Sequence, residues 1–112
     1  IFHLSGGEKQ KIACAGVSIM EPDVLVMDEP SSNLDASSIL DLRSILAFWK
    51  SQGKTIIVSE HRLYYLRGLA DRFIYMGDRW TPENAIDGRY IWLPIRFEGE
   101  QPVIEWQSEW SY

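Results

Sequence analysis

The chain has 112 residues, of which 46% are hydrophobic, and a formal net charge of −5. This composition supports a packed core and excludes a disordered tail, while the acidic balance argues against nucleic-acid binding through a basic face, so we expect no nucleic-acid partner. The one cysteine, Cys14, excludes an internal disulfide framework, and no apolar run is long enough to cross a bilayer.

The first predicted element is a helix that begins at Ser5. Ser5 and Glu8 form the Ser-x-x-Glu pattern of a capping box, which opens helices. The turn at residues 21–23 (EPD) ends the element. Apolar residues recur on one face of this helix at Ile12, Ala15 and Ile19.

Two glycines, Gly6 and Gly7, follow Ser5 at the start of this helix, although glycine is a poor helix residue. A helix N-terminus offers unpaired N–H groups and a partial positive charge, which suit a phosphate. Glycines would let a phosphate approach closely, and Ser5 adds a hydroxyl donor. The alternative is a plain helix cap whose glycines only turn the chain, and the five-residue string alone does not decide between the two.

A second helix and two strands follow. Residues 24–28 (VLVMD) and 54–60 (KTIIVSE) are short apolar runs that favour strands buried on both faces. Between them, Asp35 or Ser37 is a candidate N-cap, and Gly53 stands where a C-terminal cap belongs. The apolar face of this second helix comprises Ile39, Leu42, Leu46 and Trp49.

A third helix is predicted over residues 61–69 and a third strand over residues 72–76 (RFIYM). Alternating helices and strands predict an α/β fold with a parallel sheet and crossover helices. Ligands gather at the carboxyl ends of the strands in such sheets. Polar residues lie at two of these ends. Asp28 and Glu29 lie at the end of the first strand, and Glu60 and His61 lie at the end of the second.

The chemistry of these strand ends suits nucleotide hydrolysis. An aspartate such as Asp28 suits Mg²⁺, which takes oxygen ligands and keeps several waters, and Glu29 beside it could orient or deprotonate an attacking water. The alternatives are two solvated acids and, for His61, a histidine that caps a helix or packs in the core.

The segment 77–112 differs in character. Alternation in residues 89–97 places Ile91, Leu93, Ile95 and Phe97 on one face, and EGEQP predicts a hairpin turn before a return strand at VIEW. Pro94 predicts that the first of these strands lies at a sheet edge. For the tryptophans of this segment we expect core or interface packing rather than a ligand-stacking face, and they are Trp80, Trp92, Trp106 and Trp110.

Four motifs in order make the chain resemble the C-terminal half of the nucleotide-binding domain of ATP-binding cassette (ABC) ATPases. They are LSGGE at residues 4–8, VLVMDE at residues 24–29, SSNLD at residues 31–35 and IIVSEH at residues 56–61, which are similar to the family's signature motif, Walker B strand with catalytic glutamate, D-loop and switch histidine. The resemblance covers about residues 1–76 and implies part of a P-loop NTPase-type parallel sheet.

The resemblance implies a site divided between two nucleotide-binding domains that face each other head to tail. Ser5, Gly6 and Gly7, with Glu8 in the same motif, would bind the γ-phosphate of an ATP held by the partner domain. Asp35 would cross the interface between the two domains. The pair could be homo- or heteromeric.

The resemblance also implies roles for the strand-end residues. Asp28 would hold Mg²⁺ through water, and Glu29 would polarise the hydrolytic water. His61 would touch the γ-phosphate of the ATP bound to its own domain. Positioning and charge neutralisation carry most of the catalysis in phosphoryl transfer, in agreement with these roles.

The family's Gly-rich phosphate loop does not occur in these 112 residues. Because the chain opens on Ile1 without a methionine, we expect that the half of the domain with this loop lies upstream. Without the loop, we expect the chain alone to be inactive. The strings VSEHRLYYL and DEPSSNLD look most like the ATPases of energy-coupling-factor importers of vitamins or metal ions. Such a subunit would lie in the cytoplasm on the inner face of the membrane, bound to transmembrane transporter subunits.

Two alternatives remain. Within the family, the translation-associated ABC ATPase is the second choice, and Asn33 and Glu60 depart from its usual motifs. Outside enzymes, the chain could be a non-catalytic remnant that only binds a partner. The segment 77–112 matches no part of the family pattern and is predicted only as a hairpin-like extension.

Overall fold

The computed structural model describes residues 5–79, 83 and 88–111 of a mixed α/β chain. The chain divides into two compact units, Ile1–Leu69 and Ala70–Tyr112. The first unit contains α1 (Gly6–Ile19), β1 (Val24–Asp28), α2 (Ala36–Ser51), β2 (Thr55–Ser59) and a 3₁₀ helix η1 (Leu63–Leu66), and the second contains β3 (Phe73–Arg79), β4 (Arg89–Glu98) and β5 (Gln101–Ile104).

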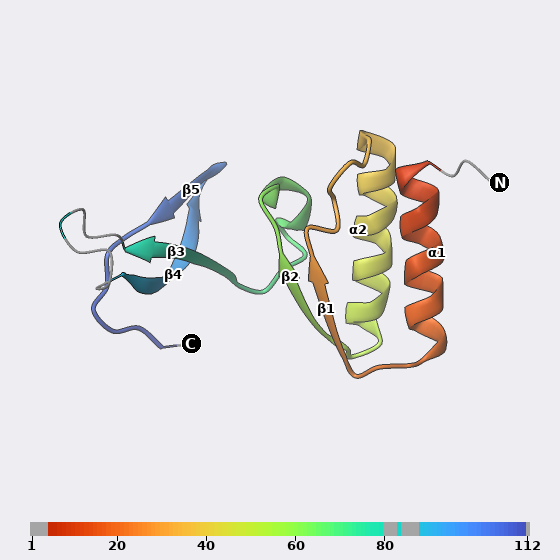
Figure 1. Ribbon diagram of the computed structural model, residues 1–112, viewed down its shortest axis with the longest axis horizontal. Coiled ribbons are helices and arrows are strands. Elements are labelled where there is room, and N and C mark those ends of the chain that lie inside the picture. Colours follow the sequence, from red (N-terminus) through yellow and green to blue (C-terminus); the bar gives the residue numbers. More distant parts are fainter. Residues whose placement is uncertain (1–4, 80–82, 84–87, 112) are drawn as a thin grey trace. The chain divides into compact units, whose positions relative to one another are not determined.

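The first unit is built on a two-stranded parallel sheet. β1 pairs with β2 in register from Val24 opposite Thr55 to Asp28 opposite Ser59, and α2 forms the crossover between them. Both helices lie on one side of this sheet and run opposite to its strands (Figure 1). The N-termini of α1 and α2 are therefore at the same end of the unit as the carboxyl ends of β1 and β2.

The local signals for the two helices are confirmed. Ser5 and Glu8 close the predicted capping box on α1, and Asp35, not Ser37, is the N-cap of α2 because its side chain accepts from the Ser38 amide. Gly53 follows the last turn of α2 with φ +79°, a backbone conformation that glycine adopts without a steric penalty.

The core of the first unit lies between α2 and the sheet. The predicted apolar face of α2 is buried as expected, and Trp49 also donates from its indole to Ser18 Oγ on α1 at 3.0 Å. Cys14 is the buried side chain that α1 contributes, so its predicted packing role is confirmed. The buried residues of this core include Cys14, Leu25, Ile39, Leu42, Leu46 and Trp49.

Two predictions about sidedness are wrong. The apolar residues Ile12 and Ile19 of α1 are 59% and 83% exposed, because α1 turns Gly7 and Cys14 inward instead. The strands are covered on only one face, since both helices lie on the same side of the sheet (Figure 1). Val26 of β1 is 73% exposed and Ile57 of β2 is 56% exposed.

The predicted helix over residues 61–69 is wrong in extent, because only the single 3₁₀ turn η1 forms. A longer helix would pair the Leu69 amide with the Tyr65 carbonyl, but this amide donates to the Leu66 carbonyl instead. Glu60 accepts from the amides of His61 and Arg62, and Arg43 of α2 donates to the carbonyl oxygens of Tyr65 and Arg67. The segment therefore follows these side chains rather than helical periodicity.

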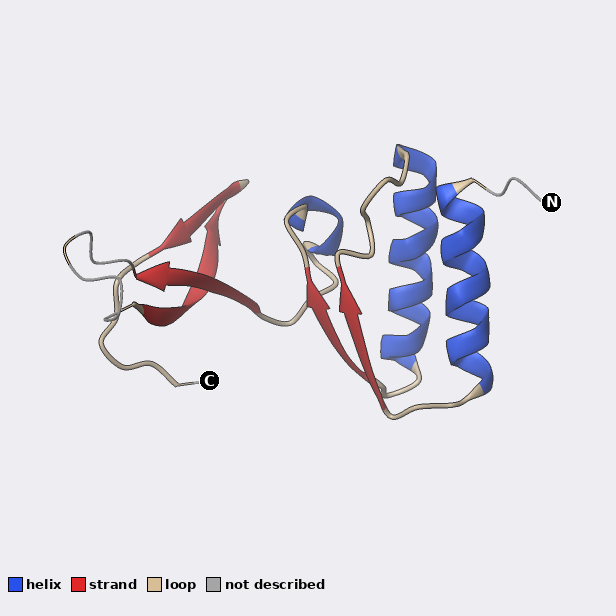
Figure 2. Ribbon diagram, viewed as in Figure 1, coloured by secondary structure: helices blue, strands red, loops and turns tan. Residues whose placement is uncertain are grey.

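The predicted third parallel strand is also wrong. β3 pairs antiparallel with β4, from Phe73 opposite Ile95 to Arg79 opposite Arg89. The three-stranded sheet of the second unit has the order β3-β4-β5, and Figure 2 draws its strands in red. Within the described residues the parallel sheet has only β1 and β2.

The hairpin in the second unit is confirmed. β4 and β5 are joined by Gly99 and Glu100, and Gly99 has the positive φ that the first position of a II′ turn requires. Pro94 does not make β4 an edge strand, since β4 lies between β3 and β5. Because β5 pairs only with residues 95–98, however, Pro94 has a strand neighbour on one side alone, where its missing N–H is tolerated.

The tail aromatics are only partly buried. The predicted face of β4 packs inward, with Leu93 buried and Phe97 edge-on to Phe73 at 5.1 Å. Trp92 and Trp106 are more than half exposed, so neither packs in the core, and interface packing stays a prediction. Trp110 is half-buried and donates from its indole to the Trp92 carbonyl at 2.7 Å, and the prediction for Trp80 lies outside the described residues.

Candidate functional site

The candidate site lies at the carboxyl ends of β1 and β2, as predicted. Asp28 and Ser59 form the last pair of the ladder, and the Glu29 amide extends it by donating to the Ser59 carbonyl at 2.8 Å. Glu29 has φ +43°, a left-handed conformation that is uncommon outside glycine and asparagine. Such strained backbone is found disproportionately at functional sites.

The structure brings Glu29 and His61 together. His61 Nε2 lies 2.9 Å from Glu29 Oε1, although 32 residues separate them along the chain. Both side chains are accessible, Glu29 at 48% and His61 at 86% exposure. An exposed pair of this kind adds little to stability on its own, so the pair is positioned by the backbones on which its members lie.

Glu60 joins the two loops that carry this pair. Its Oε2 accepts from the Ser31 amide at 3.1 Å and from the Tyr65 hydroxyl at 2.9 Å. Its Oε1 accepts from the amides of His61 at 2.9 Å and Arg62 at 3.3 Å. Partial burial raises the pKa of Glu60, but these hydrogen bonds outweigh it and lower the pKa overall, so the group is a carboxylate at neutral pH.

Sequence reasoning noted Glu60 as a polar strand-end residue but missed its two buried partners. Ser31 is completely buried and Tyr65 is 3% exposed. Burial and the hydrogen bond to Glu60 raise the pKa of the Tyr65 hydroxyl, so that it remains a donor. Their separation from Glu60 in sequence, 29 and 5 residues, matches no periodic pattern that could have signalled the contact.

The α1 N-terminus holds the other predicted ligand-binding residues. Ser5 N donates to Glu8 Oε2 at 2.8 Å and Glu8 N donates to Ser5 Oγ at 3.2 Å. Hydrogen bonds from the Ser5 backbone and side chain lower the pKa of Glu8. Glu8 therefore serves the cap, and within the described residues no hydrogen bond engages the amides of Gly6 and Gly7, which face the helix terminus.

The two glycines also have a packing role that the sequence analysis missed. A Cβ on Gly6 would lie 2.9 Å from the Asn33 carbonyl oxygen, and one on Gly7 would lie 2.9 Å from Ser38 Cβ. The start of α1 therefore packs directly against the loop before α2 and the first turn of α2. Only glycine permits this approach.

Asp35 lies beside this contact as the α2 N-cap. Its Oδ1 accepts from Ser38 N at 2.8 Å and from Ser37 Oγ at 3.2 Å. Hydrogen bonds from Ser38, and further ones from Ser37 and its own backbone, lower the pKa of Asp35. The residue is exposed, so its second carboxylate oxygen is accessible from outside the unit.

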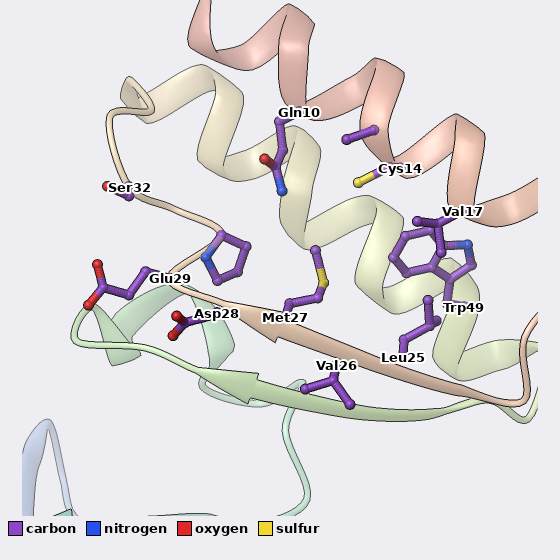
Figure 3. A pocket seen from close by; sticks show the side chains of 12 residues that line it. Gln10, Cys14, Val17, Leu25, Val26, Met27, Asp28, Glu29, Ser32 and Trp49 are labelled. Carbon is purple, nitrogen blue, oxygen red and sulfur yellow. The ribbon is translucent and has the colours of Figure 1, made fainter.

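A cavity of about 290 Å³ lies between α1, α2 and β1 (Figure 3). Asp28 and Glu29 line one end of it, and Cys14, Val17 and Trp49 line the other. Burial raises the pKa of the Cys14 thiol, which keeps it protonated and unreactive. The cavity is thus apolar inside and acidic at the end that adjoins the site.

Two further findings concern the described residues only. No group of three or more His, Cys, Asp or Glu in the described part of the chain is placed to hold a metal ion. One carboxylate with several waters is nevertheless a usual Mg²⁺ site, which Asp28 fits as an exposed strand-end acid. Across the described ranges, none of the helices is long and apolar enough to cross a membrane.

No protein-family model matches the chain, but curated proteins do. It is 58% identical over 76 residues to a putative ABC transporter ATP-binding protein of Treponema denticola, covering 68% of this chain and 16% of the relative. It is 48% identical over 95 residues to the energy-coupling factor transporter ATP-binding protein EcfA2 of Methanospirillum hungatei, covering 80% of this chain and 24% of the relative.

A third relative extends further along the chain. A putative ABC transporter ATP-binding protein of Methanosarcina mazei is 39% identical over 101 residues, covering 89% of this chain and 17% of the relative. A match of that length includes part of the segment 77–112, which the sequence analysis could not align. The chain spans a quarter or less of the length of these three relatives.

Proposed function

The chain is a homologue of the ATP-binding proteins of ABC transporters, and from this premise we propose that it supplies part of an ATP-hydrolysing site that powers membrane import. The observation that carries this proposal is the 2.9 Å contact between Glu29 and His61 at the carboxyl ends of two parallel strands. In the proposed domain organisation, residues 1–76 are the C-terminal half of a P-loop nucleotide-binding domain. Residues 77–112 are an extension.

The proposed roles follow from the charges at this edge. Glu29 holds and polarises the attacking water, because its carboxylate is accessible and its backbone is held against β2. His61 orients Glu29 and touches the γ-phosphate of the ATP bound to its own domain. Asp28 holds Mg²⁺ through water, and the ion supplies neutralisation of phosphate charge.

The N-terminus of α1 is the second part of the proposed ATP site, and we call it the phosphate seat. The amides of Gly6 and Gly7 and the partial positive charge of the helix end favour an anion. From the resemblance to ABC ATPases, we propose that this seat binds ATP held by a second domain, so that ATP lies between two such domains placed head to tail. Ser5, with Glu8 as its capping partner, and Asp35 would lie at that interface.

The EcfA2 relative favours an energy-coupling-factor type of importer. We propose that the whole protein binds transmembrane subunits at the inner face of the membrane and drives uptake of a vitamin or metal ion. The membrane subunits would choose that cargo.

Glu29→Gln in the full-length protein tests the catalytic assignment. The amide keeps the size of the side chain but cannot accept a proton, so we expect ATP binding to remain within about threefold while turnover falls by about 100-fold or more. ATP binding is measured by equilibrium titration and turnover by steady-state phosphate release. Glu21→Gln, at an exposed position outside the site, is the matched control. An unchanged turnover rate in Glu29→Gln would remove Glu29 from this role.

A further inference from the structure

The Glu60 carboxylate has the hydrogen-bonding geometry of a tie between two loops. Its oxygens each receive two donors, one oxygen from Ser31 and Tyr65 and the other from His61 and Arg62. A carboxylate is acceptor-only when ionised, so it matches four converging donors. The side chain thus connects the loop after β1 to the segment after β2.

The partners of Glu60 are themselves fixed. Ser31 and Tyr65 are buried, and Arg43 of α2 donates to the carbonyl oxygens of Tyr65 and Arg67, the latter at 3.0 Å. Hydrogen bonds therefore connect α2 to Tyr65 and Tyr65 to Glu60. Glu60 in turn accepts from the amide of Ser31, which lies two residues after Glu29.

The Glu29–His61 pair, by contrast, has little packing of its own. Both side chains are accessible to solvent, and one exposed contact between two side chains is too weak to hold two loops in place. Glu60 is adjacent to His61 in sequence and bonds its amide. The part-buried hydrogen bonds of Glu60 are consequently a second link between the two loops, besides the bond from the Glu29 amide to the Ser59 carbonyl.

We propose that Glu60 is a positioning residue for hydrolysis, which holds the His61 loop and the Ser31 loop at the separation that keeps Glu29 and His61 in contact. This inference rests on the proposed function, because it assigns Glu60 a role in the same site. Glu60 touches neither substrate nor water in this role. It acts through the backbone of its neighbours.

Glu60→Gln in the full-length protein is the main test. The amide has the shape of the carboxylate but replaces one acceptor oxygen by an NH₂ group that faces two donors, so about half of the tie is lost. We expect kcat for ATP to fall by about 10- to 100-fold, as for a small misplacement of catalytic groups. KM for ATP should change by less than about threefold, because Glu60 itself makes no contact with ATP and the α1 N-terminus does not depend on it.

Hydrogen exchange supplies a measurement that does not depend on activity. The amides of Ser31 and His61 should exchange at least about tenfold faster in Glu60→Gln. Tyr65→Phe removes a single donor and should give a smaller effect in the same direction on both exchange and kcat. Glu21→Gln is again the matched control and should change neither.

The outcomes separate this inference from the proposed function. If exchange at Ser31 and His61 is unchanged in Glu60→Gln, Glu60 does not tie the loops and the inference fails. If exchange accelerates while kcat stays at the wild-type value, or falls only in proportion to the folded fraction, Glu60 is structural alone and the inference also fails. If the wild-type protein does not hydrolyse ATP, the proposed function fails, and the exchange data still decide whether the tie exists.

Discussion

The roles of Gly6 and Gly7 depend on the residues against which they pack. The phosphate-seat interpretation explains why the α1 N-terminus is open, but the structure adds a packing reason for Gly7, which is buried against Ser38. Gly6 approaches the Asn33 carbonyl in the same way. The glycine pair therefore serves the contact between α1 and α2, whatever it binds.

A Cβ at Gly7 should destabilise the protein through this contact. We expect Gly7→Ala to lower the free energy of unfolding by about 1–3 kcal/mol, since an added methyl group overpacks a close contact. In a Ser38→Gly background the loss should shrink by at least about 1 kcal/mol, because the clashing Cβ is gone. Urea unfolding of the full-length protein measures both.

Gly16→Ala is the matched control for that experiment. It lies in the same helix, and an added Cβ would meet nothing within 4 Å. Alanine is the better helix residue, so this variant should be more stable by about 0.5–1 kcal/mol. Equal losses in Gly7→Ala with and without Ser38→Gly would contradict the packing explanation.

At the level of elements, the ends of the helices are set locally and their faces are not. The cap of α1 and the cap of α2 each depend on residues three positions apart; the first was predicted, and the second was narrowed to Asp35 or Ser37. The buried face of α1 was not, because Gly7 and Cys14 pack inward while Ile12 and Ile19 face outward. In a short helix with few apolar residues, the surface against which the helix packs decides which of its faces is buried.

The Asp35 cap predicts a pH dependence of α2. Hydrogen bonds from Ser38 and Ser37 lower the pKa of Asp35 below its usual 3.8. A depressed carboxyl pKa stabilises the folded state above the unfolded-state pKa, and this contribution disappears as the pH falls through the folded-state pKa. The stability difference between wild type and Asp35→Asn should therefore shrink from about pH 5 to about pH 3, since asparagine caps without titrating.

Thermal unfolding of the full-length protein across that range measures this effect. Asp23 is an exposed aspartate outside the helix caps, and Asp23→Asn is the control. The stability difference between wild type and this variant should not change with pH in the way expected for Asp35→Asn. A constant difference between wild type and Asp35→Asn would show that the Asp35 charge does not contribute through the cap.

At the scale of the whole molecule, the proposed function requires a second domain. The phosphate seat at α1 and the Glu29–His61 pair each provide one part of a nucleotide site, and the chain spans a quarter or less of its three described relatives. We therefore expect the full-length protein, in a Glu29→Gln background, to associate into dimers when ATP is added.

Ser5→Asp tests whether α1 faces ATP in that dimer. Aspartate caps a helix as well as serine does, so α1 should remain folded. Its negative charge would repel the γ-phosphate, so ATP-dependent association should fall by at least about tenfold by analytical ultracentrifugation. Ser5→Thr, which keeps both the cap and the hydroxyl, should associate normally. Normal association of Ser5→Asp would place ATP away from α1.

Much of the first unit followed from local sequence alone. The caps at Ser5 and Asp35, the strands β1 and β2 and the buried face of α2 depend on residues close together in the chain. The meeting of Glu29 and His61 also followed, because parallel strands bring their carboxyl ends to one edge.

Tertiary structure alone decided the rest. The antiparallel pairing of β3, the exposure of Val26 and Ile57 and the hydrogen bond from the Ser31 amide to Glu60 depend on how segments distant in sequence are placed. A strand's pattern states that it can pair but not with which partner, and an apolar residue's burial depends on whether another element covers it. Local sequence therefore determined where α1, α2, β1 and β2 form, while contacts between segments determined the extent of η1, the buried faces and the strand partners.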